Sequence, residues 1–163
     1  MVIRNNVFFQ TRQAITIETH PLAGASRNIH IYQNTHYVDE DLSSTHLFCS
    51  ASSSGSEIVV EDNLAVLYSN TESTHFVTGN ATLYNNYVYT PSQSGECERP
   101  DGSGTCTDPN LANTSDLQSP DFMMPRAGSL AIDAATDAII SNDFYGTPRP
   151  QGSAPDIGAV ERL

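Results

Sequence analysis

The chain has 163 residues, enough for one domain with its own core, and a hydrophobic content of 38% that is ordinary for a folded protein. Its 19 acidic residues against 7 arginines, with no lysine, give a net charge of −12, so we expect neither nucleic acid nor an anionic membrane as a partner. No run of about 18 apolar residues occurs, so the sequence predicts no membrane span.

A four-residue pattern recurs in the first 90 residues, at 3–6, 31–34, 60–63 and 83–86. Each copy is an aliphatic residue, two mostly polar residues and an Asn, followed by strand-forming residues. The asparagines are 28, 29 and 23 residues apart, a spacing typical of stacked repeats. Because stacked amides can hydrogen-bond from one repeat to the next, we predict a structural ladder of Asn6, Asn34, Asn63 and Asn86.

A second marker supports the same register. Thr-His-Leu-Phe at 45–48 and Thr-His-Phe-Val at 74–77 are 29 residues apart, which is also the step from Asn34 to Asn63. Segments 14–17, 29–32 and 58–61 are rich in β-branched residues with a period near two, which predicts strands.

Alternate residues of a strand share a face, so inward aliphatic residues place their neighbours outward. If the aliphatic residue of each copy points inward, one outer face carries Arg4, His30, Tyr32, Glu61 and Tyr84. Tyrosine rings stack on sugars, and Arg and Glu bind hydroxyl groups, so we predict a glycan-binding face. An ordinary solvated sheet surface is the alternative interpretation.

Residues 91–128 break the repeat pattern, since several prolines remove the backbone donors that central strands need. Cys97 and Cys106 bracket a polar loop, for which we predict a disulfide, with a zinc site as the less favoured alternative. We expect no required cofactor. Calcium is an optional ligand with weak candidate positions, because carboxylate oxygens suit that ion. These positions are Asp39, Glu40, Asp41, Asp101 and Asp108.

The end of the chain resembles a known family. Gly-Ser-Leu-Ala-Ile-Asp-Ala at 128–134, Gly-Thr-Pro-Arg-Pro-Gln-Gly at 146–152 and Ala-Pro-Asp-Ile-Gly-Ala-Val-Glu at 154–161 are similar, in this order, to the terminal block of secreted right-handed parallel β-helix proteins of the pectate-lyase-like family. Leu130 replaces the usual Pro, and Val160 the usual Tyr. The match covers about 35 residues, and the Asn-marked repeats resemble the body of the same family.

The resemblance implies an all-β, right-handed parallel β-helix, a single-stranded solenoid of about four to five coils with an irregular C-terminal cap. We expect one domain over residues 1–163, with repeat coils at 1–90, an irregular segment at 91–128 and a capping block at 129–163. No cap precedes the first repeat. We therefore expect the chain to be the C-terminal part of a longer β-helix, its open N-terminal coil covered by upstream coils or another chain.

The sequence and the resemblance together favour two functions. The first is an extracellular or cell-surface protein that binds or processes a glycan on the outward-facing parallel sheet, without a complete catalytic site in this chain. The second is a non-catalytic structural or adhesive surface module. An enzyme of this family would be a polysaccharide lyase or a glycoside hydrolase. The lyase is disfavoured because no Lys exists to act as the base, which leaves only Arg4, Arg12 and Arg27 in the repeats.

Overall fold

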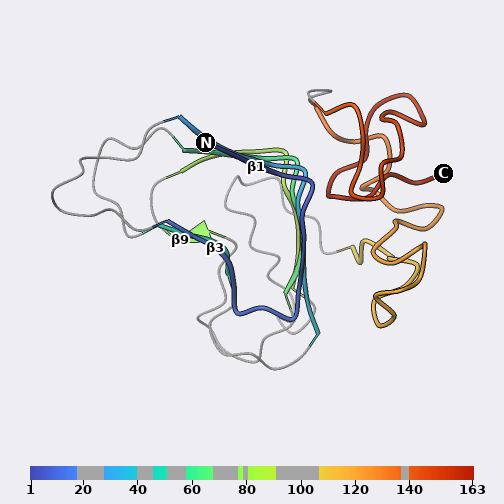
Figure 1. The fold of residues 1–163 in the computed structure, drawn as a ribbon, viewed down its shortest axis with the longest axis horizontal. Helices are drawn as coiled ribbons and strands as arrows, with labels where there is room; N and C mark the ends of the chain where they lie inside the picture. Colours follow the sequence, from blue (N-terminus) through green and yellow to red (C-terminus); the bar gives the residue numbers. More distant parts are fainter. Residues whose placement is uncertain are drawn as a thin grey trace, which may run out of the picture.

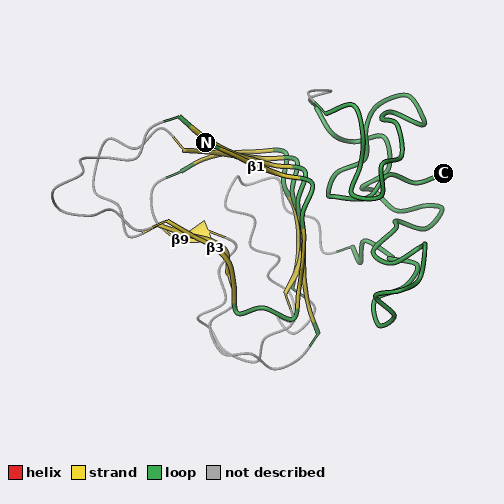
Figure 2. Cartoon of the chain, in the orientation of Figure 1, coloured by secondary structure: helices red, strands yellow, loops and turns green. Residues whose placement is uncertain are grey.

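The fold is described from a computed structural model. It describes residues 1–17, 28–39, 46–50, 58–67, 77–78, 81–90, 107–136 and 140–163. These residues contain eleven strands and no helix, and every strand lies between Val2 and Tyr89. Figure 2 shows the strands gathered on one side of the molecule and the C-terminal residues as loops and turns on the other.

The strands form three parallel sheets in which every third strand along the chain is a neighbour. Sheet A has the order β1 (Val2–Arg4), β4 (Ile29–Tyr32), β7 (Ile58–Glu61), β10 (Thr82–Tyr84). Sheet B has the order β2 (Val7–Phe9), β5 (Thr35–Val38), β8 (Leu64–Leu67), β11 (Tyr87–Tyr89). Sheet C has the order β3 (Gln13–Ile17), β6 (His46–Ser50), β9 (Val77–Thr78). Neighbouring strands therefore come from equivalent positions of successive sequence repeats.

Two-residue turns connect each strand of sheet A to the next strand of sheet B. The first turn residue has a positive φ in all four cases, at Asn5 (55°), Gln33 (49°), Asp62 (51°) and Asn85 (44°). This left-handed conformation costs most residues about 1–2 kcal/mol, and Asn and Asp tolerate it best. Three of the four turns use those two residue types, which explains why the second polar residue of each copy is so often Asn or Asp.

The main hydrophobic core lies between the inner faces of the three sheets. Ile31 and Val60 of sheet A and Val38 and Leu67 of sheet B are completely buried there. Ile15 of sheet C closes the same cluster. Burial alternates along β7 because Ile58 and Val60 point into this one-sided core, while Val59 and Glu61 point away from it.

Sheet B is covered on its outer face as well. Every residue of β5 and β8 is buried, and the C-terminal residues supply the cover. Ala159 and Val160 pack with Val66, and the backbone N–H of Ala159 donates to the Thr35 hydroxyl at 2.9 Å. Figure 1 shows these C-terminal residues, in orange and red, beside the stacked strands of sheet B.

The right-handed parallel β-helix with an end cap is therefore a wrong prediction for the residues described. The strands form open sheets, two of four strands and one of three, and these residues show no closed sheet or continuous solenoid. The C-terminal block, residues 107–163, lies against the outer face of sheet B, rather than over the last coil as the predicted cap would. The physical reason is that sheet B is apolar on both faces and needs a cover, as parallel sheets generally do.

Candidate functional site

Strand register brings the five predicted glycan-binding residues onto one outer face. Arg4, Tyr32, Glu61 and Tyr84 occupy matching positions in β1, β4, β7 and β10, and so form one row across sheet A. A second row, two residues earlier in each strand, contains His30. We call this surface the sheet A face. It consists of Val2, Arg4, His30, Tyr32, Val59, Glu61, Thr82 and Tyr84.

Exposure separates these residues. The Tyr84 side chain is 54% exposed at the edge of the sheet, and Arg4 and His30 are also exposed. Glu61 is half-buried. Tyr32 is only 6% exposed, so its ring is not available as a platform for a ligand and must be removed from the predicted contacts. Tyr32 lies in the central strand β4, whereas Tyr84 lies in the edge strand β10.

The four ladder asparagines lie at the corner between sheets A and B. The side-chain N–H of Asn34 donates to the amide oxygen of Asn63 at 3.0 Å, and Asn63 donates in turn to Asn86 at 2.9 Å. Asn6 donates to Asn34 at 3.0 Å and begins the series. The last three are buried, and their amides also bind strand carbonyls such as that of Ile31. Since these amides are occupied by backbone and by one another, they have a structural and not a chemical role.

A second column of turn residues attaches the C-terminal block to the sheets. The Asp62 carboxylate accepts the backbone N–H of Thr136 at 3.1 Å and the Asn85 side-chain N–H at 2.6 Å. Asn85 also donates to the Ala134 carbonyl at 2.7 Å, and the Asn5 side chain donates to the Asn142 carbonyl. The sequence patterns marked the turn positions but gave no indication that Asp62 would bind a segment 74 residues away.

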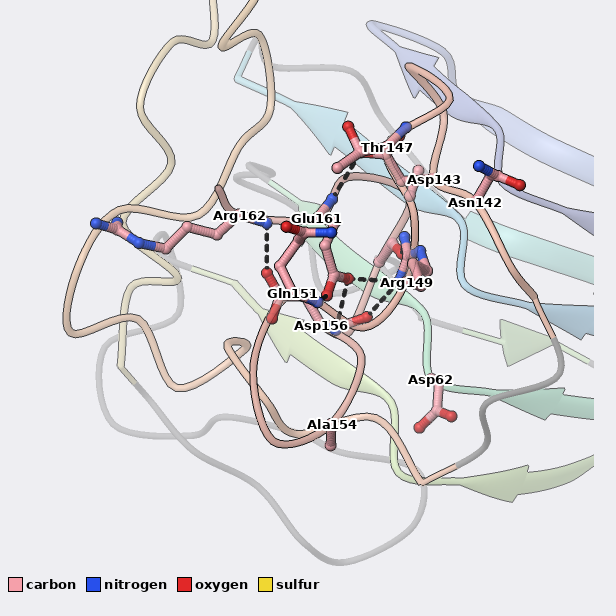
Figure 3. Close-up of polar contacts among 12 residues, drawn as sticks. Asp62, Asn142, Asp143, Thr147, Arg149, Gln151, Ala154, Asp156, Glu161 and Arg162 are labelled. Atoms are coloured by element: carbon pink, nitrogen blue, oxygen red, sulfur yellow. Dashed lines mark hydrogen bonds and ion pairs between the residues drawn. The ribbon is translucent and has the colours of Figure 1, made fainter.

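Buried charges of the C-terminal block form a separate network, shown in Figure 3. Arg149 and Glu161 form a buried ion pair at 3.3 Å, and Arg149 also donates to the carbonyl oxygens of Asp156 and Gly158, each at 2.8 Å. Burial lowers the pKa of Arg149. Burial likewise raises the pKa of Asp156, although backbone N–H groups of two neighbours oppose that shift.

Backbone groups occupy the carboxylates of this network. Glu161 accepts the N–H groups of Gln151 and Asp156, and the buried Asp143 accepts those of Tyr145, Thr147 and Glu161. These acids therefore hold loops of the C-terminal block together. Arg149, Asp156 and Glu161 belong to the terminal motifs that carry the family resemblance, so the network explains why those motifs contain Arg, Asp and Glu.

The remaining candidates are only partly described. Glu40, Asp41, Asp101, Cys97 and Cys106 lie outside the described residues. Asp39 accepts a hydrogen bond from the Gln10 side chain, and Asp108 accepts the N–H of Asn110 at 2.7 Å. In the part of the chain that the structure describes, no three His, Cys, Asp or Glu residues gather as ligands for a metal ion. The calcium and disulfide predictions thus stay predictions.

Comparison with known proteins found no relative of this chain. The chain matches no protein-family model, no curated protein and no solved structure at a significant level. The resemblance of the terminal motifs to the pectate-lyase-like family is therefore without independent support. Within the described residues, no helix is long and apolar enough to cross a membrane.

Proposed function

We propose that the protein is a non-catalytic carbohydrate-binding protein of the cell exterior, and that the sheet A face binds a neutral polysaccharide. The observation that carries the proposal is the parallel register, which aligns Arg4, Glu61 and the exposed ring of Tyr84 in one row, with His30 beside it. Strands about 4.8 Å apart repeat on the length scale of a sugar ring. An extended glycan can thus lie across several strands.

Charge decides between neutral and acidic glycans. The net charge of −12 opposes a polyanion, and Arg4 is the single arginine among the eight residues of the sheet A face. A neutral glycan is not repelled by this negative charge. Its hydroxyl groups can donate hydrogen bonds to Glu61 and accept them from Arg4. Binding of neutral glycans is thus favoured over binding of uronic-acid polymers.

The same face argues against hydrolysis. A glycosidase generally needs two carboxyl groups about 5–10 Å apart. Glu61 is the single carboxylate among the eight residues of the sheet A face. Asp62, which follows Glu61, is buried and accepts the Thr136 N–H, and the acids of the C-terminal network also bind backbone N–H groups. Recognition without bond cleavage is the function that this arrangement supports.

A glycan array followed by affinity electrophoresis in neutral and acidic polysaccharides tests the proposal. We expect retardation in at least one neutral polysaccharide, reduced about tenfold or more by Tyr84→Ala because the ring supplies the stacking surface. Phe144→Ala is the matched control, since Phe144 is 47% exposed but belongs to the C-terminal block. Absence of glycan binding, or equal effects of the two substitutions, contradicts the proposal and favours a structural or adhesive module.

A further inference from the structure

The ladder asparagines bind the repeat that precedes them through the same three hydrogen bonds. The side-chain oxygen of Asn63 accepts the backbone N–H and the side-chain N–H of Asn34, each at 3.0 Å, and the Asn63 side-chain N–H donates to the Ile31 carbonyl at 3.0 Å. Asn34 and Asn86 make the equivalent bonds to the repeats before them. The matching partner of a ladder residue is therefore a strand with an aliphatic residue three positions before an Asn.

Asn6 is the ladder residue without such a partner. Among the described residues, its side-chain oxygen accepts no hydrogen bond, and its side-chain N–H donates only to the Arg4 carbonyl at 2.8 Å and to Asn34 at 3.0 Å. The backbone next to it has the same free side. The Asn6 carbonyl and the Gln10 N–H bind β5, so the alternation of a parallel strand directs the Val7 N–H away from β5.

The apolar side chains on this side are incompletely buried. We call the sides of β1 and β2 that face away from β4 and β5 the β1–β2 edge. Ile3 is half-buried, whereas Ile31 beside it in the register is completely buried. All of β2 is half-buried and all of β5 is buried, while Met1 and Val2 are 60% and 55% exposed. An unpaired edge with exposed apolar side chains is a template for a further strand.

Burial and charge both oppose a second copy of this chain as that strand. The opposite edge of sheet B is β11, in which Tyr87 and Val88 are already buried, so a second copy does not offer it for stacking. Two β1–β2 edges would instead bring two unpaired Asn6 oxygens together. Each copy also carries a net charge of −12, which repels another copy. The strand that fits best therefore comes from a different protein and is neutral or basic.

We propose that the β1–β2 edge binds an extended segment of a partner protein as an added parallel strand, and that this segment has an aliphatic residue three positions before an Asn. The Asn donates its backbone and side-chain N–H groups to the Asn6 oxygen, and the carbonyl of the aliphatic residue accepts the Asn6 side-chain N–H. Backbone bonds to β1 and β2 supply affinity, and the Asn fixes the register. The inference does not depend on glycan binding by the sheet A face.

Fluorescence anisotropy with the intact chain and a labelled synthetic peptide tests the edge. The probe has the sequence of residues 29–38, because this segment pairs with β1 and β2 on their other side and contains no acidic residue. We expect saturable binding. Asn34→Asp in the peptide should weaken it at least about tenfold, because a carboxylate cannot donate to the Asn6 oxygen. A scrambled peptide of the same composition is the control and should not bind.

Variants of the protein locate the binding. Asn6→Leu should weaken it at least about tenfold, whereas Gln118→Leu, which removes an exposed amide of the C-terminal block, should not. Val7→Pro removes an N–H of the edge and keeps the bonds to β5, so it tests the edge even if Asn6→Leu does not fold.

Two outcomes would overturn the proposal. One is that the probe does not bind, or binds no better than the scrambled peptide, and this leaves the glycan experiment unaffected. The other is self-association in sedimentation velocity that Asn6→Leu abolishes, which would identify a second copy as the occupant of the edge.

Discussion

The strand region, residues 1–90, and the C-terminal block, residues 107–163, satisfy their buried polar groups in different ways. The strand region uses one neutral side chain repeatedly, since Asn34 and Asn63 each donate to the next ladder residue at about 3 Å. The C-terminal block uses a buried ion pair, Arg149 with Glu161, and carboxylates that each bind several backbone groups. The Asn ladder distributes its stabilising hydrogen bonds over equivalent positions. The network around Arg149 and Glu161 concentrates its stabilising contacts in a few residues.

This difference has an energetic consequence. Removing a neutral hydrogen-bonding partner from a buried site costs about 1–3 kcal/mol, while breaking a buried ion pair costs about 3–5 kcal/mol. The C-terminal block should therefore be more sensitive to single substitutions than the ladder, although the ladder contains more hydrogen bonds between side chains. The largest loss of stability should therefore come from breaking the ion pair.

Arg149→Met should destabilise the protein by about 3–5 kcal/mol, because it leaves the Glu161 carboxylate buried without its positive partner. It also removes the donors for the carbonyl oxygens of Asp156 and Gly158. Urea unfolding followed by circular dichroism measures the loss. Arg4→Met on the exposed sheet A face is the control and should change the free energy of unfolding by no more than about 0.5 kcal/mol.

A double variant sharpens this prediction. Arg149→Met combined with Glu161→Gln removes both charges, so its cost should be smaller than the sum of the two single costs. Strict additivity of the two substitutions would show that the charges act independently and that the pair is not the centre of the network.

Asn34→Leu should destabilise by about 1–3 kcal/mol. The substitution removes the acceptor of Asn6 and the donor to Asn63, and it leaves the Tyr32 carbonyl without one of its partners. Asn6→Leu should cost clearly less, because Asn6 begins the ladder and is only half-buried. Equilibrium unfolding of both variants checks the order. An equal loss of unfolding free energy at the two positions would contradict a larger contribution from the buried, central residues of the ladder.

Asp62 joins the two regions, so its substitution should affect the contact between them more than either region alone. Asp62→Asn should cost about 1–2 kcal/mol, since a charged acceptor of the Thr136 N–H is replaced by a neutral amide. Hydrogen exchange at the Thr136 amide should accelerate about tenfold or more, while the Asn63 backbone amide keeps its protection. Asp116→Asn, an exposed position, is the control for the loss of one charge.

The sequence predicted best what repeats and worst what occurs once. Spacing alone identified the Asn6–Asn34–Asn63–Asn86 series, and the structure places these residues in register. The alternation rule identified the outward row but not the burial of Tyr32, because alternation gives the direction of a side chain and not what surrounds it.

The overall fold was mispredicted for a related reason. The terminal motifs were expected to cover an open end, but nothing in them states which surface they will meet. The outer face of sheet B determines that surface, because its apolar residues, such as Val66 and Leu64, must be shielded from water. The attachment through Asp62 and the pairing of Arg149 with Glu161 are contacts between distant positions without a period, so no local pattern indicates them.

The smallest predicted effect concerns pH and again separates the two regions. Burial raises the pKa of Asp156 above its ordinary value of 3.8, so the folded state binds this proton more tightly than the unfolded state. The contribution of Asp156 to stability therefore grows as the pH falls through its raised pKa toward 3.8, opposite to the usual effect of acid.

Asp156→Asn cannot titrate, so its free energy of unfolding should fall more steeply with acid over that interval than that of the wild type. The difference in slope is at most about 1.4 kcal/mol per pH unit, the limit for one proton. Urea unfolding of both proteins at several pH values measures it. Asn63→Leu is the matched substitution in the strand region. It removes no titrating group, so it should lower the whole curve without changing its slope. Parallel curves for Asp156→Asn and the wild type would show that the C-terminal network does not hold this carboxyl in a desolvated position.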